Sequence, residues 1–145
     1  MSPRTVAQKM GVRPGSRAFV QGASDSALRA LDLPDLERPD RIEGAFDHLH
    51  LFTTTQEHMR AHFPILLDHL AQSGMLWVSW PKGGRLGTDL TMKSVIEIGY
   101  DLAMVESTCL RVDHTWAALK FTRPKPGKTY RNSYGTLPRQ RPDPT

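Results

Sequence analysis

The segment Gly74-Met75-Leu76-Trp77-Val78-Ser79-Trp80 decides the fold of this 145-residue chain. It is the longest nearly continuous apolar stretch, and its apolar side chains alternate onto both faces of an extended strand. This pattern is typical of a central strand in a parallel sheet that is covered on both sides. The stretch is far too short for a membrane span, which needs about 20 residues. We therefore expect a buried central strand.

Helices and strands alternate on both sides of this segment. Residues 46–52 alternate between apolar and polar side chains and predict a strand, and apolar residues at helical spacing from Met59 to Leu70 predict a helix. Because proline disrupts a helix interior, we expect a break near Pro64 and a second helix that ends at Ser73-Gly74. Further helices are expected at residues 5–10, at 24–31, and from Thr88, Asp89 or Thr91 to Leu102; further strands at 17–21, 40–43, 104–112 and 116–121; and a flexible loop at 81–87.

This order of elements predicts an α/β domain of three layers with a mostly parallel sheet. The tight turn at Asp113-His114 makes the final strand antiparallel to the one before it. A C-terminal antiparallel hairpin strand favours a reduced methyltransferase-like, Rossmann-like architecture over a plain dinucleotide-binding domain. We expect one α/β domain over residues 1–122, followed by a basic, proline-rich tail over 123–145 that is either disordered or docked in an extended form.

Positive charge is concentrated in that tail. The chain has 19 Lys and Arg against 15 Asp and Glu, but residues 123–145 alone carry a net charge of +5 and residues 1–122 a net charge of −1. A nucleic-acid footprint over the whole body is therefore excluded. Nucleic acid remains a possible partner of the segment Arg123–Arg141, where Tyr130 and Tyr134 stand among the cations, and a solvated tail is the simpler alternative.

The remaining composition limits the cellular setting. Cys109 is the single cysteine, which excludes a disulfide scaffold and a cysteine-rich zinc site. Residues 1–11 lack the apolar stretch of a signal peptide. We expect a soluble cytoplasmic protein without membrane contact, present as a monomer or a homodimer.

Three stretches resemble an uncharacterised bacterial group, the domain-of-unknown-function family 3052. The similar stretches are Lys9-Met10-Gly11-Val12-Arg13-Pro14-Gly15, then Gly74 to Lys82 followed by Thr88-Asp89-Leu90-Thr91, and Asp113 to Phe121. The resemblance covers residues 5–122. It implies a small methyltransferase-like fold and no established activity.

A cofactor turn is one candidate site. S-adenosylmethionine binding needs a glycine-rich turn after the first strand, and here Gly22 and Ser24 occupy that turn with one glycine where two or three are expected. Glu43 stands at about the spacing of a ribose-binding acid. A structural remnant of such a turn is the alternative, and it leaves the domain with no cofactor.

A ligand site at the end of the central strand is the second candidate. Trp80 could stack on a planar ring, Lys82 could meet an anion, and Asp89 could act as a base. The alternatives are a core position for Trp80, a solvated Lys82 and a helix cap for Asp89.

The histidines and the cysteine give weaker signals. His48 and His50 share one face of a strand, and His58 and His62 are four residues apart on a helix. Neither pair has an acidic partner in the sequence, so we expect solvent-facing histidines and no metal site. We expect Cys109 to be buried as a small hydrophobe, with no base nearby to make it a nucleophile.

A degraded cofactor turn within a suitable strand order favours a non-catalytic methyltransferase-like domain that binds a small molecule or a protein. Three alternatives remain open. They are an S-adenosylmethionine-dependent methyltransferase with a degenerate cofactor loop, a nucleic-acid accessory protein that acts through its tail, and a small-molecule enzyme that works at Trp80, Lys82 and Asp89.

Overall fold

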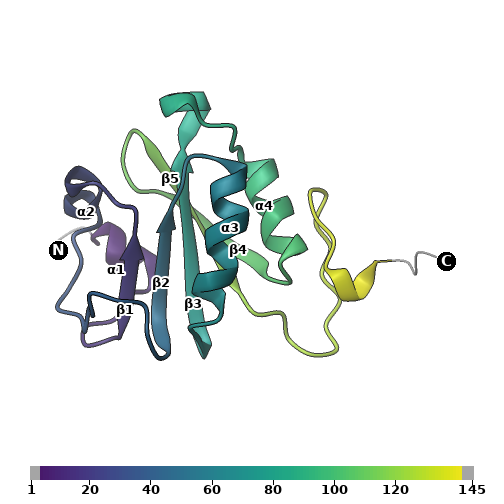
Figure 1. Cartoon of the computed structure of the whole chain (residues 1–145), viewed down its shortest axis with the longest axis horizontal. Helices are drawn as coiled ribbons and strands as arrows, with labels where there is room; N and C mark the ends of the chain where they lie inside the picture. The colour runs from purple at the N-terminus through teal and green to yellow at the C-terminus, as the bar shows by residue number, and fades with distance from the viewer. Residues whose placement is uncertain (1–3, 142–145) are drawn as a thin grey trace.

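The computed structural model describes residues 4–141, which form a five-stranded sheet with helices on both faces (Figure 1). None of the helices in this range is long and apolar enough to cross a bilayer. The elements in chain order are α1 (Val6–Met10), β1 (Ala18–Gln21), α2 (Asp25–Leu31), β2 (Phe46–Phe52), α3 (Gln56–Leu67), β3 (Leu70–Pro81), the 3₁₀ segment η1 (Lys82–Gly87), α4 (Met92–Asp101), β4 (Val105–Arg111), β5 (Trp116–Thr122) and the 3₁₀ turn η2 (Pro138–Gln140).

The sheet has the strand order β1-β2-β3-β5-β4. β2 pairs in parallel with both β1 and β3, whereas β5 is antiparallel to both β3 and β4. All strands except β5 therefore run in the same direction. The prediction of a mostly parallel α/β sheet with a C-terminal antiparallel hairpin strand is confirmed, and Gly74–Trp80 lies within the central strand.

Successive residues of β3 face two separate cores. Leu76 and Val78 belong to the core under α3 and α4, and Trp77 belongs to the core under α1 and α2. Because alternate residues of a strand point to opposite faces, the two helix pairs cover opposite sides of the sheet. Figure 1 shows α3 and α4 side by side, well apart from α1 and α2. This arrangement gives the three predicted layers.

The helix after β2 differs from the prediction. α3 is continuous across Pro64 and ends at Leu67, before Ser73-Gly74. Met59 and Phe63 on one side of Pro64 and Leu66 on the other are all fully buried against the sheet. This shared apolar face holds one helix where proline alone favours two.

Ser73-Gly74 lies within β3 instead of ending a helix. The β2–β3 register passes from Phe46↔Leu70 to His48↔Met75, so β3 has extra residues here and forms a bulge. A side chain on Gly74 would lie 2.8 Å from the Leu70 Cδ1 and 2.9 Å from the Phe46 carbonyl oxygen. The glycine therefore permits close approach between strands and does not mark a helix end.

The short strand predicted at residues 40–43 is absent. Pro39 and the left-handed Gly44 (φ +74°) frame a bend at these residues. The loop instead pairs with the chain before β1 through a bridge between Arg17 and Glu37, where the Ala18 N–H donates to the Glu37 carbonyl at 2.9 Å. Proline at position 39 removes a donor and stops this pairing from extending into a strand.

The described part of the tail, residues 123–141, folds back on itself beside α4, with a bridge between Asn132 and Gly135 and the turn η2 near its end (Figure 1). Leu137 is buried in the core under α3 and α4. The Tyr100 hydroxyl donates to the Glu106 carboxylate at 3.2 Å, and the Asn132 amide donates to the same carboxylate. Residues 142–145, including Asp143, lie outside the described residues.

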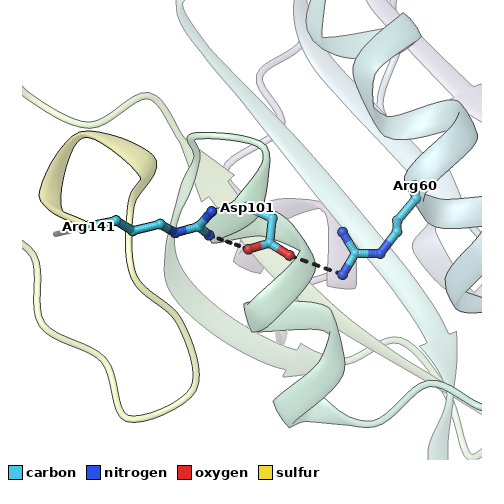
Figure 2. A network of polar contacts seen from close by, with 3 residues as sticks. All are labelled: Arg60, Asp101 and Arg141. Atoms are coloured by element: carbon cyan, nitrogen blue, oxygen red, sulfur yellow. Dashed lines mark hydrogen bonds and ion pairs between the residues drawn. The ribbon is translucent and has the colours of Figure 1, made fainter. Parts of the chain in front are cut away.

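A network of ion pairs joins the end of the described tail to α3 and α4. Figure 2 shows Asp101, the last residue of α4, between Arg60 of α3 and Arg141 of the tail. The Arg60 Nη2 lies 3.0 Å from the Asp101 Oδ2, and Arg141 binds the other carboxylate oxygen. Two of the basic side chains on which a nucleic-acid contact would depend thus already bind groups of this same chain. Arg141 binds the Asp101 carboxylate, and Arg139 donates to the Lys125 and Lys128 carbonyls.

Candidate functional site

Three parallel strands end together at one edge of the sheet, which we call the carboxyl edge. β1 ends at Gln21, β2 at Phe52 and β3 at Pro81, and the register pairs Gln21 with Leu51 and Phe52 with Ser79. Ligands of open α/β sheets collect at this edge because the strand-to-helix connections leave crevices there. The position of each candidate residue relative to the carboxyl edge therefore decides whether it can meet such a ligand.

A cavity of about 590 Å³ lies at this edge, between the end of β3, the start of α4 and the end of β4. Its volume falls in the range of roughly 300–1,000 Å³ that is typical of small-molecule sites. We call it the carboxyl-edge cavity. Its apolar lining comes from Trp80, Leu90, Met92, Leu110 and Ala117, and its polar lining includes Lys82, Cys109 and Arg111.

Positive charge gathers beside this cavity. Desolvation lowers the pKa of the Lys82 ammonium, the neighbouring Arg111 and Arg85 lower it further, and Asp113 acts in the opposite direction. The Arg85 guanidinium also donates to the Lys82 carbonyl at 3.1 Å. Like charges this close raise the free energy of the empty site, and an anion placed among them would relieve that repulsion.

Lys82 and Trp80 both border the cavity, as their position in the sequence suggests. Trp80 is only 4% exposed and packs in the core under α3 and α4, so nearly all of its ring is committed to the fold and only a small part of it borders the cavity. Lys82 is half-buried at the start of η1. The loop around Lys82 forms an irregular 3₁₀ segment whose Gly83 and Gly84 have positive φ angles.

Asp89 does not face the cavity. Its carboxylate accepts the Gln56 backbone N–H at 2.8 Å, and its carbonyl accepts the Gln56 side-chain amide at 2.9 Å. Asp89 thus caps α3, the helix before it in the sequence, whereas Thr91 caps α4 by accepting the Ser94 N–H. This bond fixes the Asp89 carboxylate at the start of α3, and Asp89 is not among the residues that line the carboxyl-edge cavity.

Gly22 and Ser24 lie together at the carboxyl edge after β1. Gly22 has a φ of +82°, and a side chain there would stand 2.7 Å from the Phe52 carbonyl oxygen. Ser24 caps α2 by accepting the Ala27 N–H at 3.2 Å. Both residues therefore have structural roles that hold with or without a cofactor.

Glu43 lies at the other end of the sheet. It is exposed and precedes Phe46, the first residue of β2, whereas Gly22 stands at the level where β2 ends. Six residue steps along β2, from Phe46 to Phe52, separate the two levels, or about 20 Å. Glu43 cannot serve as the ribose-binding acid of a site at Gly22, because the 32–45 loop leads back to the start of β2 and places it too far away.

His48 and His50 are fully buried, so the expectation of solvent-facing histidines is wrong for this pair. β2 has neighbours on both sides and helices on both faces, and its polar alternation does not mark an exposed face. The His50 Nε2 lies 2.7 Å from the Ser79 Oγ, and the remaining ring nitrogens of the pair have no hydrogen-bond partner among residues 4–141. Burial lowers the pKa of His48 to about 4 and that of His50 in the same direction.

His58 and His62 stack on one another on α3, with ring centroids 4.0 Å apart. The His58 Nδ1 lies 2.8 Å from the Thr53 Oγ1, and the Gln21 side-chain amide donates to the His62 Nδ1 at 2.9 Å. Burial and the neighbouring His62 lower the pKa of His58. Within residues 4–141, no group of three or more His, Cys, Asp or Glu residues is placed to hold a metal ion.

Sequence reasoning missed Met92, Cys109 and Arg111 as lining residues. They come from the start of α4 and from the edge strand β4, which reach Trp80 only in the folded sheet. Cys109 is exposed, not buried as expected, because β4 pairs on one side only and its outer half faces solvent. The polar residues that flank Cys109 in β4 were the available signal of an exposed edge.

Comparisons with known proteins bear on the fold. No protein-family model and no curated protein matches this sequence, so the resemblance to family 3052 stays a prediction. Solved structures do match. The ribosomal protein L11 methylase of Lactobacillus delbrueckii subsp. bulgaricus is 15% identical with a TM-score of 0.53, over 83% of this chain and 75% of that one.

Two further solved structures are similar. A methyltransferase from Pyrococcus furiosus is 16% identical with a TM-score of 0.55, over 80% of this chain and 79% of that one. A magnesium protoporphyrin IX methyltransferase from Synechocystis PCC 6803, with bound S-adenosylmethionine, is 12% identical with a TM-score of 0.53, over 81% and 74%. Identities this low establish the architecture alone: this chain has the methyltransferase-like α/β fold.

Proposed function

We propose that this chain is a ligand-binding domain that takes a small amphipathic organic anion in the carboxyl-edge cavity. The observation that carries the proposal is the lining of that cavity, in which apolar side chains stand beside Lys82 and Arg111, with Arg85 close to Lys82. The apolar part would receive an aliphatic or aromatic body against Met92 and the small exposed part of Trp80. Lys82 and Arg111 would receive a carboxylate, sulfonate or phosphate.

The local chemistry favours binding over catalysis. Asp89, the residue that the sequence offers as a base, is held at the N-terminus of α3 and is not among the residues that line the cavity. Partial desolvation by its neighbours raises the pKa of the exposed Cys109 thiol, which lowers its thiolate fraction at neutral pH. A cavity that holds a charged ligand without an activated base or nucleophile suits recognition.

A charged fluorescent probe tests this proposal. The dye 8-anilinonaphthalene-1-sulfonate has an apolar ring system and one negative charge, so its fluorescence should rise with saturable one-site binding. Met92→Glu, which places a negative charge in the cavity, and Arg111→Gln should each weaken binding by about tenfold or more. Ile65→Glu is the matched control, because Ile65 is an apolar side chain, 50% exposed, on α3 and outside the cavity.

Equal binding by the wild type and the Met92→Glu variant would reject the proposal. The melting temperature of each variant shows whether the fold is intact. Dye that binds a loosened core would respond to the Ile65→Glu and Met92→Glu variants alike, which also counts against a specific site.

A second candidate is an S-adenosylmethionine-dependent methyltransferase. Its support is the likeness to solved methyltransferases, of which one holds S-adenosylmethionine and another S-adenosylhomocysteine. Gly22 and Ser24 stand at the strand end where such a cofactor would bind in this fold. The separation of Glu43 from that end removes one expected contact, so this candidate depends more on the fold than on the site.

Calorimetric titration with S-adenosylmethionine and S-adenosylhomocysteine separates the two candidates. Saturable heat at micromolar ligand that Met92→Glu leaves unchanged would place the cofactor outside the carboxyl-edge cavity and support the methyltransferase. No heat up to millimolar ligand, together with dye binding as described above, would support the ligand-binding domain.

A further inference from the structure

A second cavity, of about 690 Å³, opens at the opposite end of the sheet, where β2 and β3 begin and β5 ends. We call it the amino-edge cavity. It lies between the connection from α1 to β1 and the β3 bulge at Ser73-Gly74. Ligands of α/β sheets normally collect at the carboxyl edge, so a site here would not follow from the fold.

His48 is a fully buried polar group that borders this cavity. Its side chain is 0% exposed, and neither ring nitrogen has a hydrogen-bond partner within the described part of the chain. An unpaired buried polar group destabilises the folded state, so a ligand that bonds to it gains free energy. Burial lowers the pKa of His48 to about 4, so the ring is neutral at pH 7 and offers one donor and one acceptor.

The ring of His48 is held in place by its neighbours. The His50 ring lies edge-on to the His48 ring, with their centroids 6.0 Å apart. The His50 ring also stacks on Phe52 and forms a hydrogen bond with the Ser79 hydroxyl. None of these contacts satisfies a nitrogen of His48. Both nitrogens are thus unpaired among residues 4–141 and buried within the wall of the cavity, so a ligand reaches one of them through a small shift of that wall.

The charge of the lining favours an anion. Arg13 and Lys120 both line the cavity, and neither takes part in an ion pair among residues 4–141. The one acid of the lining, Asp47, is engaged, because its Oδ2 accepts the Arg17 backbone N–H at 3.0 Å. The hydroxyls of Ser16, Ser73 and Thr122 add further hydrogen-bonding groups.

We propose that the amino-edge cavity binds a small oxyanion, a phosphate or a carboxylate, with Arg13 and Lys120 holding its charge and His48 bonding to one of its polar atoms. Charge-assisted bonds from Arg and Lys to such groups are among the stronger polar contacts in proteins. The ligand would supply the partner that His48 lacks. This site is independent of the carboxyl-edge cavity, and neither proposal needs the other.

The experiment follows the imidazole nitrogens of the full chain by NMR. Inorganic phosphate and citrate are titrated separately up to about 20 mM, a range that reaches weak affinities, with sodium chloride at matched ionic strength as a control. We expect the His48 nitrogen signals to shift and saturate with one of the two anions, while the exposed His114 serves as a reference. Saturation by phosphate or by citrate identifies which oxyanion the site takes.

Three variants complete the test. Arg13→Gln, in an exposed loop, and Lys120→Met should each weaken the anion by about tenfold or more, since each removes one charge. Lys93→Met, an exposed lysine on α4, is the matched control. Signals of His48 that follow chloride as closely as phosphate and citrate, or unchanged affinity in the Arg13→Gln variant, would overturn the proposal.

Discussion

The two edges of the sheet hold cavities of opposite character. At the carboxyl edge, an apolar lining around Trp80 stands beside clustered cations, and the loop that closes it has exposed glycines with positive φ angles. At the amino edge, the lining is polar, includes the buried His48, and rests on the β3 bulge at Gly74. The comparison shows that one strand, β3, can present unlike surfaces at its two ends, because a different connection closes each end.

Lowering the pH should have the largest effect on the stability of the protein, and this effect arises at the amino edge, where His48 lies. The folded protein keeps His48 neutral, with a pKa of about 4, whereas the unfolded chain binds a proton near the ordinary value of 6.5. Stability should therefore fall as the pH drops from about 6.5 to about 4, by roughly 3 kcal/mol from His48 alone. His50, whose pKa is also lowered, acts in the same direction.

Urea unfolding at a series of pH values measures this effect. The carboxylates of the chain also titrate in acid, so the relevant quantity is the difference between the wild type and His48→Gln. The variant should lose part of the pH dependence, and His114→Gln, in the exposed turn before β5, should lose little. Parallel curves for the wild type and His48→Gln would contradict a buried neutral histidine.

Matched glycine substitutions compare how tightly the two edges are built. Gly74→Val should destabilise the protein by about 1–3 kcal/mol, because its side chain would meet Leu70 and the Phe46 carbonyl. Gly84→Ala meets no atom within 4 Å and should cost only about 1 kcal/mol, from its φ of +76°. Denaturant midpoints at constant slope give both values, and a larger loss at Gly84 would reverse this account.

Ser79→Ala tests the buried polar pair between the edges. The substitution leaves the His50 Nε2 without its 2.7 Å partner and should cost roughly 1–2 kcal/mol, as expected for a buried polar group that loses its bond. Ser73→Ala is the control, since Ser73 is exposed. Equal stability of the two variants in thermal unfolding would show that the contact contributes nothing.

The smallest effect is expected away from both cavities. Asp101→Asn removes the charge that Arg60 and Arg141 share at the surface (Figure 2). Partly exposed ion pairs contribute about 0–1 kcal/mol, so stability should fall by less than about 1 kcal/mol, and less in high salt. A loss as large as that of Gly74→Val would mean that the tail stabilises the body much more than this ion pair suggests.

Local patterns predicted the elements better than their surroundings. The strand over Phe46–Phe52 follows from alternation, and Thr91, the cap of α4, is one of the three candidates that capping chemistry offered; both signals act over a few residues. The burial of His48 could not be predicted, because it depends on helices that cover β2 from elsewhere in the chain. The helix break predicted at Pro64 was wrong for the same reason, because the apolar face that α3 buries against the sheet outweighs the local preference of proline.

The candidate site was predicted in part. Trp80 and Lys82 border the cavity because the end of a central strand is defined by one segment of sequence. Met92 and Arg111 could not be assigned, since sheet order decides which strand lies beside that end. Glu43 shows the limit of spacing arguments: the separation along the chain from Gly22 fits a cofactor site, but the connection returns to the wrong edge.

The docked tail changes how a nucleic-acid role can be tested. Composition suggests truncating the chain at Arg123. However, the side chain of Leu137 is buried in the core, and the Asn132 amide donates to the Glu106 carboxylate, which also accepts the Tyr100 hydroxyl. A fragment that ends there would lose folding cooperativity together with charge, and any loss of binding would be ambiguous. Charge removal at single exposed positions such as Arg131 leaves the docked segment in place and isolates electrostatics from unfolding.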